Sequence, residues 1–283
     1  MGMEFWLVTT AHLEDRLWFN DEEDFKVGMN YVPIIATGME MGVMAFVLMS
    51  NHVHFLLAGS KEKVQAFIQD YKKRYSQYYG RKYLCREFLR RNSVDIRQVL
   101  LGDESFERAV AYIHMNSVAA NICLHPWLYP WSTGACFFNA SVKTNGTPVE
   151  SLSVREKARV FKTHAPIPPG LILGENGYIE PSSYVPVAFV ESVFRTPKRM
   201  NYFLQSSSKA RRKDAAPSFS DQLIRSALAD LCTSLFQKRE WANLSQSQLS
   251  ELLRQLRYRF SADPHQLARV SGIPYETVCA RLE

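Results

Sequence analysis

The sequence has few of the features that mark membrane or secreted proteins. No stretch approaches the roughly 18 apolar residues that a membrane-spanning helix needs, and the N-terminal residues have no basic segment ahead of an apolar one. The five cysteines are odd in number and form no Cys-x-x-Cys pair, which argues against a disulfide framework and against a cysteine zinc site. We therefore expect a cytoplasmic protein with no membrane partner.

The net charge is a modest +6, but the charges are unevenly distributed. Basic residues alternate with tyrosines between residues 61 and 91, as is typical of nucleic-acid-binding proteins, because cations bind phosphates and rings stack on unpaired bases. The DNA-binding residues predicted in this segment are Lys72, Lys73, Arg74, Tyr75, Arg81 and Lys82. An amphipathic helix with its tyrosines packed inward and its cations in solvent gives the same pattern, and both interpretations can hold together.

The most informative segment is residues 49–57, Met-Ser-Asn-His-Val-His-Phe-Leu-Leu. Side chains alternate between the faces of a strand, so His52 and His54 point the same way, with Cα atoms roughly 6–7 Å apart. Two imidazoles so placed can bind one metal ion. The apolar flanks indicate a largely buried sheet, where imidazoles need partners. Two interpretations of the histidine pair remain open: a metal site, or two polar residues on the solvent face of a strand.

A second segment, residues 105–116, is expected to form a helix with Asp103 or Ser105 as its N-cap. On that helix Arg108, Tyr112 and Asn116 are four residues apart and share one face. A phenol, a cation and an amide oxygen suit phosphate chemistry as nucleophile, charge stabiliser and metal ligand. The alternative is a half-buried tyrosine with polar neighbours, and the Tyr-x-x-x-Asn spacing alone favours that alternative.

The order of these segments, with Tyr-Ile-His-Met-Asn at 112–116 and Tyr-Pro-Trp-Ser-Thr at 129–133, resembles the single-tyrosine transposases of the HUH endonuclease superfamily. Within that superfamily the sequence is most similar to the REP-associated tyrosine transposases, over about residues 3–135. The resemblance implies that His52 and His54 are the metal-binding pair, that Tyr112 is the nucleophile, and that Asn116 completes the metal site. It implies Mg²⁺ or Mn²⁺ as the cofactor.

The expected elements have an α+β, ferredoxin-like order. The resemblance implies that they form an HUH nuclease domain over residues 1–140. They are a strand at 3–10, a helix to about 41, paired strands at 43–49 and 52–57, a helix at about 62–80, a strand at 94–101 and the tyrosine helix to about 118. The two paired strands are separated only by Ser50-Asn51, which indicates an antiparallel hairpin. This order lets the tyrosine helix pack across the sheet face that carries both histidines.

The remainder of the chain divides into a proline-rich connector and linker at 141–217, with a Ser/Lys/Arg run at 206–213, and a helical region at 218–283. In the helical region, Ala268 precedes Gly272 by four residues, as two helices that meet at a short turn require. This arrangement resembles a helix-turn-helix whose second helix follows Pro274. The DNA-binding residues predicted there are Tyr275, Thr277 and Arg281. A helical hairpin with no DNA role is the alternative.

Together these features predict a metal-dependent endonuclease and strand transferase, transposase-like, that acts on single-stranded or hairpin DNA of REP type through a 5′-phosphotyrosine intermediate. Arg108 and Tyr112 are the predicted catalytic residues. Two other functions remain open. One is a domesticated DNA-binding regulator without catalysis, and the other is a metallo-phosphoesterase for a small substrate with Tyr112 in a structural role. The sequence does not decide between a monomer and a homodimer.

Overall fold

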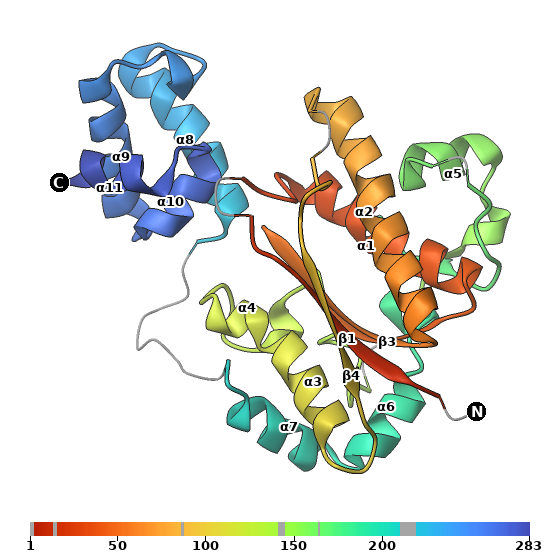
Figure 1. The fold of residues 1–283 in the computed structure, drawn as a ribbon. Helices are drawn as coiled ribbons and strands as arrows, with labels where there is room; N and C mark the ends of the chain where they lie inside the picture. Colours follow the sequence, from red (N-terminus) through yellow and green to blue (C-terminus); the bar gives the residue numbers. More distant parts are fainter. Residues whose placement is uncertain (1–2, 14–15, 86–87, 141–144, 164, 210–218) are drawn as a thin grey trace.

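The fold joins a four-stranded antiparallel sheet, covered by helices on both faces, to a group of helices at the C-terminal end (Figure 1). The computed structural model describes residues 3–13, 16–85, 88–140, 145–163, 165–209 and 219–283. The strands of the sheet are β1 (Phe5–Thr10), β2 (Gly42–Met49), β3 (His52–Ala58) and β4 (Val94–Val99), hydrogen-bonded in the order β2-β3-β1-β4. This antiparallel order confirms the predicted α+β fold class.

The helices around the sheet are α1 (Glu22–Gly38), α2 (Lys61–Tyr83), α3 (Ser105–His114), α4 (Asn116–Ala119), α5 (Val154–Phe161), α6 (Val187–Phe194) and α7 (Pro197–Ser206). The C-terminal helices are α8 (Asp221–Phe236), α9 (Gln246–Phe260), α10 (Pro264–Ser271) and α11 (Tyr275–Leu282). A short strand pair, β5 (Thr147–Pro148) and β6 (Ile172–Leu173), lies between α4 and α6 in the chain. None of the described helices has the length and apolar character that crossing a bilayer requires.

The two faces of the sheet have different partners. On β3, Val53 and Phe55 belong to a core shared with α1 and α2, whereas Leu56 belongs to a second core shared with α3. Alternation along the strand therefore puts His52 and His54 on the α3 side of the sheet. The predicted packing of the tyrosine helix across the histidine face is confirmed, since the His54 ring contacts that of Tyr112 on α3.

Helix α3 differs from its prediction at both ends. Its N-cap is Glu104 in a left-handed conformation without a side-chain cap, because the carboxylate of Asp103 instead accepts a hydrogen bond from Ser105 N at 3.0 Å. The helix ends at His114, and α4 begins at Asn116. The Asn116 side chain donates to the carbonyls of Tyr112 and Ile113, and so competes with the backbone bonds that would continue the helix.

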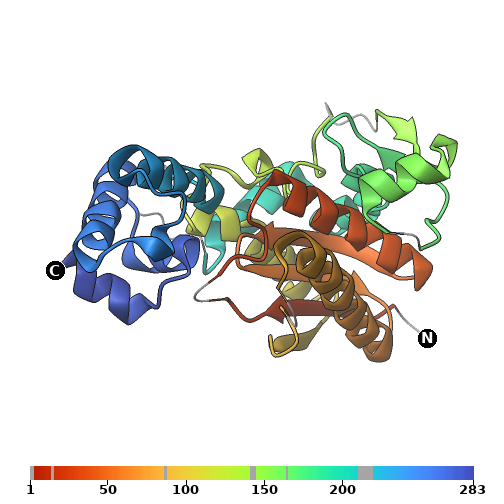
Figure 2. The ribbon, with the colours of Figure 1, turned by 90° about the horizontal axis from the view of Figure 1, so that it is seen from above.

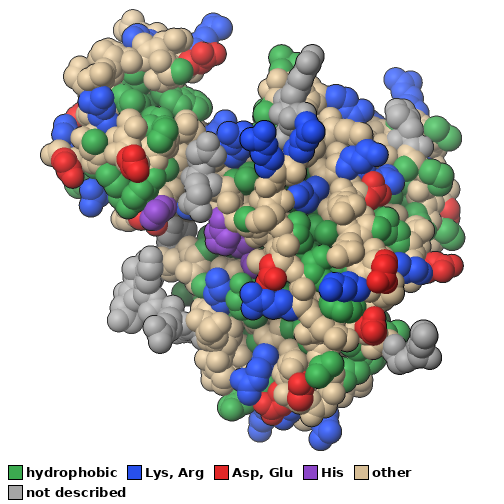
Figure 3. All heavy atoms as spheres, viewed as in Figure 1, with side chains coloured by type: hydrophobic (Ala, Val, Ile, Leu, Met, Phe, Trp, Pro, Cys, Tyr) green, Lys and Arg blue, Asp and Glu red, His purple; other side chains and the backbone are tan. Residues whose placement is uncertain are grey.

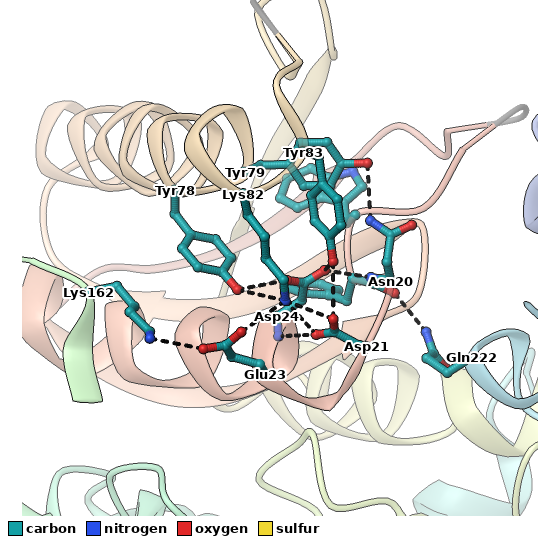
Figure 4. Close-up of polar contacts among 12 residues, drawn as sticks. Asn20, Asp21, Glu23, Asp24, Tyr78, Tyr79, Lys82, Tyr83, Lys162 and Gln222 are labelled. Carbon is teal, nitrogen blue, oxygen red and sulfur yellow. Dashed lines mark hydrogen bonds and ion pairs between the residues drawn. The ribbon is translucent and has the colours of Figure 1, made fainter. Parts of the chain in front are cut away.

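Helix α2 packs its tyrosines inward. Tyr71 and Tyr75 are fully buried against Trp18 and Phe55, so the rings of this helix form core. At the C-terminal end of α2, Lys82 binds three carboxylates near the start of α1, as Figure 4 shows. These are Asp21, Glu23 and Asp24, of which Asp24 is fully buried. The ion pairs fix the position of α1 relative to α2.

Residues 145–209 pack on the sheet and its helices. Helix α5 lies against α1, and α6 and α7 add Val190, Phe194 and Phe203 to the core beneath α3. The rings of Phe5 and Phe189 are stacked with centroids 5.8 Å apart, which joins α6 to β1. Residues 210–218, which include the end of the predicted linker run and the predicted boundary at 217–218, lie outside the described residues.

The C-terminal helices have a core of their own and lie beyond one end of the sheet (Figure 2). Ser245 and Gln248 form a capping box at the start of α9. Between α10 and α11 the chain turns at Gly272, whose φ of 71° is left-handed, and Ala268 is buried at the crossing. The short turn predicted from the Ala268–Gly272 spacing is therefore present.

Candidate active site

The hairpin of β2 and β3 holds the two histidines in fixed orientations. Their rings are perpendicular, with centroids 4.8 Å apart. Nδ1 of His54 is 3.0 Å from Oγ1 of Thr9 on the neighbouring strand β1, and Nδ1 of His52 is 2.8 Å from Oδ1 of Asn51. Because each Nδ1 is engaged, the Nε2 atom of each ring is the one presented on the α3 side.

Both Nε2 atoms are buried and meet no hydrogen-bond partner among the described residues. Burial lowers the pKa of His54 to about 3, with the charges of Lys209 and His12 acting in the same direction and the Asn116 side chain opposing them. Burial also lowers the pKa of His52 well below its ordinary value, helped by His54 and His12. Neutral imidazoles with orphaned nitrogens suit a divalent metal ion, so the pair fits the predicted cofactor.

Tyr112 lies directly beside this pair. The centroid of its ring is 5.3 Å from that of His54, in an edge-to-face arrangement, and the side chain is half-buried. Burial raises the pKa of Tyr112, while the positive charge of Arg97 lowers it and Asp95 raises it. The phenol is therefore protonated at neutral pH, and it must lose that proton to act as a nucleophile.

Asn116 is buried next to the same pair, at the start of α4. Its Nδ2 atom donates to Tyr112 O at 2.7 Å and to Ile113 O at 3.2 Å. These bonds use the nitrogen of the carboxamide and leave its oxygen, the atom type that hard metal ions prefer. Within the part of the chain that the structure describes, no three His, Cys, Asp or Glu side chains are grouped to hold a metal, so an oxygen from Asn116 is a reasonable third ligand.

Lys209 is a cation over the tyrosine ring that the sequence analysis did not single out. Lys209 Nζ lies 5.3 Å from the centroid of the Tyr112 ring. The predicted Arg108 is instead paired with Glu104 at 2.8 Å and lies over the ring of Phe203 on α7. The structure thus brings Tyr112, the histidines and Asn116 together, but it turns Arg108 toward a different set of partners.

Helix α7, which precedes Lys209, is clamped to the outer side of α3. Arg199 binds Glu107 at 3.0 Å and Glu104 at 3.5 Å, and its guanidinium lies over the Phe203 ring. Glu107 is almost completely buried, so this ion pair is shielded from water on one side. The clamp holds the first turn of α7 on α3, and Lys209 follows the other end of that helix.

The DNA-binding residues predicted on α2 lie on the opposite side of the sheet from Tyr112, and several have internal partners. Tyr75 is wrong as a base-stacking residue, because its ring is fully buried and its hydroxyl donates to Trp18 O. Lys82 is occupied by its carboxylates, Arg74 by Asp70 at 2.8 Å, and Lys72 by the carbonyl of Asn92. The tyrosines and several of the cations of this helix therefore contribute mainly to the packing of the fold.

A basic groove of about 840 Å³ nevertheless runs along the outer side of α2. Its lining includes three cations of the predicted set, Lys72, Lys73 and Arg81, of which Lys73 and Arg81 are exposed. In the view of Figure 3, Lys and Arg side chains gather above and below the hollow in which histidines are visible. The exposed cations of the groove are the members of the predicted set that remain available to a phosphate backbone.

The residues predicted on the last helix lie on the outer side of the C-terminal helices, close to the C-terminus (Figure 1). Tyr275 is exposed and stacks on His265 with ring centroids 4.0 Å apart, while Thr277 and Arg281 are partly exposed. Val278, on the same helix, is buried in the core. These three side chains are thus not brought to the Tyr112 site.

The comparison with known proteins agrees with this geometry. Residues 10–115 match the family described as transposase, IS200-like. Over these residues the chain is similar to the IS200-like transposases. The matched segment contains His52, His54 and Tyr112, and the family indicates transposase-like DNA endonuclease activity. No curated protein and no solved structure matched the chain.

Three residues near the site lie outside what sequence reasoning found. Thr9 is opposite His54 in the β1–β3 register, so a strand pairing deduced in advance would have identified it. His12 stacks on His52 with ring centroids 3.8 Å apart, although it is in the loop after β1. Lys209 gives no local signal, because its position depends on how α7 packs on α3. Thr9 and Lys209, which contact the histidine pair and Tyr112, therefore lie outside the matched segment.

Proposed function

We propose that this protein is a metal-dependent single-strand DNA endonuclease and strand transferase that acts on hairpin DNA of REP type, with Tyr112 as its nucleophile. The observation that supports this most strongly is the contact of the Tyr112 ring with His54, one of two buried imidazoles whose Nε2 atoms have no hydrogen-bond partner among the described residues. His52, His54 and Asn116 would hold Mg²⁺ or Mn²⁺. When bound, the ion supplies Lewis-acid polarisation of the scissile phosphate.

The tyrosine oxygen attacks phosphorus, and the bond from phosphorus to the 3′ oxygen of the preceding nucleotide breaks. The 3′ oxygen takes up a proton and leaves as a free 3′-hydroxyl, while the 5′-phosphate stays on Tyr112. A different 3′-hydroxyl can later attack the same phosphorus and release the tyrosine, which rejoins two strands. Lys209, which lies over the Tyr112 ring, and Arg97, whose charge lowers the Tyr112 pKa, would stabilise negative charge on the phenol oxygen or the phosphate, the role predicted for Arg108.

The test uses hairpin DNA with single-stranded flanks, labelled at either end, in the presence of Mn²⁺. We expect the 3′-labelled strand to form an adduct with the protein that survives SDS, because the tyrosine keeps the 5′-phosphate. The 5′-labelled strand should give a shorter fragment that a polymerase can extend. Tyr112→Phe should abolish both products, whereas Tyr258→Phe, which alters a highly exposed tyrosine on α9, should leave them unchanged. Peptide mapping of the nucleotide to another tyrosine would contradict the assignment.

A further inference from the structure

The C-terminal helices are attached to the turn of the histidine hairpin. Asp221, the first residue of α8, is buried and accepts a hydrogen bond from Ser50 Oγ at 2.6 Å. The same carboxylate binds Arg269 Nε at 3.2 Å and Gln266 Nε2 at 2.9 Å, both on α10. Gln222 makes a second attachment, at 2.8 Å, to the backbone of the loop before α1, as Figure 4 shows. Two C-terminal helices are thereby fixed beside the turn.

A cleft of about 650 Å³ lies between the two parts of the protein. One wall is the hairpin turn with His12 and His52, and the base is the end of α4 and the residues after it. The opposite wall comes from the C-terminal helices, and includes Phe219, Phe260, Ser261, Asp263, Gln266 and Arg269. The volume is within the range of about 300–1,000 Å³ for small-molecule sites. The cleft is therefore large enough for a nucleotide and begins at a proposed metal ligand.

The chemistry of the C-terminal wall suits a nucleobase better than a phosphate. Phe219 and Phe260 form an apolar corner, with ring centroids 5.2 Å apart, and Phe219 is 45% exposed. Asp221 and Asp263 add two carboxylates that disfavour an anion, although Arg269 offsets one of them. Ring surfaces beside hydrogen-bonding groups are the usual environment of an unstacked base in single-stranded DNA.

We propose that this cleft binds one unpaired nucleotide next to the scissile phosphate, so that the C-terminal helices help to select the sequence that is cleaved. The inference rests on the proposed function for the identity of the strand. It assigns a role in single-strand recognition to Phe260 and its neighbours, which is distinct from duplex reading by α11. His52 lines the same cleft, and its Nε2 has no hydrogen-bond partner among the described residues. A base bound in the cleft therefore lies beside the proposed reaction centre.

The binding test uses the full chain with Tyr112→Phe, so that no strand is cut. Short single-stranded oligonucleotides of random sequence are selected for binding, and the enriched sequence is titrated in equilibrium measurements. Phe260→Leu keeps an apolar side chain against the C-terminal core but removes the ring, and we expect affinity for the enriched sequence to fall roughly tenfold. Tyr258→Leu removes an exposed ring two positions earlier on the same helix and should leave affinity unchanged.

A second measurement compares the flanking sequences of the adducts that each protein forms with a randomised strand when Tyr112 is intact. Phe260→Leu should relax the preference at one position beside the cleaved bond, whereas Tyr258→Leu should retain it. If Phe260→Leu binds the enriched sequence as tightly as its parent, with the same base preference, the inference is overturned. Absence of any adduct would contradict the proposed function alone, because the binding result decides the cleft separately.

Discussion

Alternate residues of β3 point to the two faces of the central sheet, and the buried side chains on the two faces differ in how they are partnered. On the α1/α2 face, Phe55 packs on the rings of Phe67 and Tyr71, and the cation at the end of α2 is matched by carboxylates, although Trp18 Nε1 has no hydrogen-bond partner among the described residues. On the α3 face, His52 and His54 are just as buried, but each has a nitrogen without a partner among the described residues. The α3 face thus presents two orphaned imidazole nitrogens on neighbouring rings, beside Tyr112.

This contrast shows that the segment whose composition suggests DNA binding is not the segment that holds the proposed reaction centre. The tyrosine-rich basic helix has the composition of a DNA-binding element, but most of it stabilises the fold. The face with few charges holds the proposed reaction centre. Buried polar groups without partners cost free energy, so their persistence is a stronger sign of function than a run of exposed charges.

The largest expected effects compare neighbouring residues of β3. His54→Ala should reduce adduct formation to background and weaken Mn²⁺ binding in calorimetry, while the protein stays folded, because the imidazole makes few internal bonds. Phe55→Ala should instead lower the free energy of unfolding by about 3–5 kcal/mol, since it empties a fully buried site. Urea denaturation followed by circular dichroism measures the second effect. Unchanged Mn²⁺ affinity in both His52→Ala and His54→Ala would leave the pair with a structural role.

A smaller effect concerns the cation beside the tyrosine. Lys209→Met should slow adduct formation about tenfold at saturating DNA, with DNA affinity nearly unchanged, because Lys209 acts on developing charge near Tyr112. Lys209→Arg should recover part of the rate. Arg108→Met and Lys157→Met remove the same charge from α3 and from the distant α5, and both should have rates close to the unaltered protein. A rate loss in Arg108→Met that exceeds that in Lys209→Met would restore Arg108 to the role first predicted.

Next in size is the effect of the basic groove on α2. Lys73→Gln and Arg81→Gln each remove an exposed cation, so each should lower the salt dependence of single-strand binding by about 0.7 in log–log slope, if it contacts a phosphate. Tyr75→Phe loses the bond to Trp18 O and should lower the free energy of unfolding by about 1 kcal/mol without altering DNA affinity. Salt titrations of binding separate these variants. Equal salt slopes in all of them would show that DNA does not follow this face.

The smallest effect is the pH dependence that arises from the Lys82 cluster. Burial raises the pKa of Asp21, but hydrogen bonds from Lys82 and from Asp24 N outweigh it, and the pKa is lowered. Hydrogen bonds from Lys162 and Lys82 lower the pKa of Glu23. Both carboxylates therefore stabilise the fold above their ordinary values of 3.8 and 4.5, and this stability is lost as the pH falls through their lowered values.

In Lys82→Met, that acid-dependent loss of stability should be smaller than in the unaltered protein. The measurement is the urea midpoint of both proteins across the acid range. Lys61→Met, which removes a cation from the other end of α2, should keep the pH dependence of the unaltered protein. Identical pH profiles in Lys82→Met and the unaltered protein would show that the cluster is electrostatically unimportant.

Local periodicity explains which predictions succeeded. The two-residue period put His54 on the face that α3 covers, and the four-residue spacing put Tyr112 and Asn116 near it, because those rules depend only on neighbours in the chain. The same spacing put Arg108 beside Tyr112, whereas the structure pairs Arg108 with Glu104. The same reasoning could not decide whether Tyr75 points inward or outward, since that depends on where the sheet lies. The acidic residues before α1 were visible in the sequence, but their pairing with Lys82 depends on two helices that are far apart in the chain. The position of Lys209 depends on how α7 packs on α3 through Arg199, and no local sequence pattern indicates that packing.

The packing of α6 and α7 has a practical consequence for shortened forms of the protein. A fragment that stops near residue 140 would lose Val190, Phe194 and Phe203, and would expose the apolar surface of α3 and β1 that they cover. Large exposed apolar patches favour aggregation, so we expect such a fragment to express poorly. A fragment that continues through Lys209 keeps both the cover and the cation. For recombinant work on the nuclease, the useful end point therefore lies after α7.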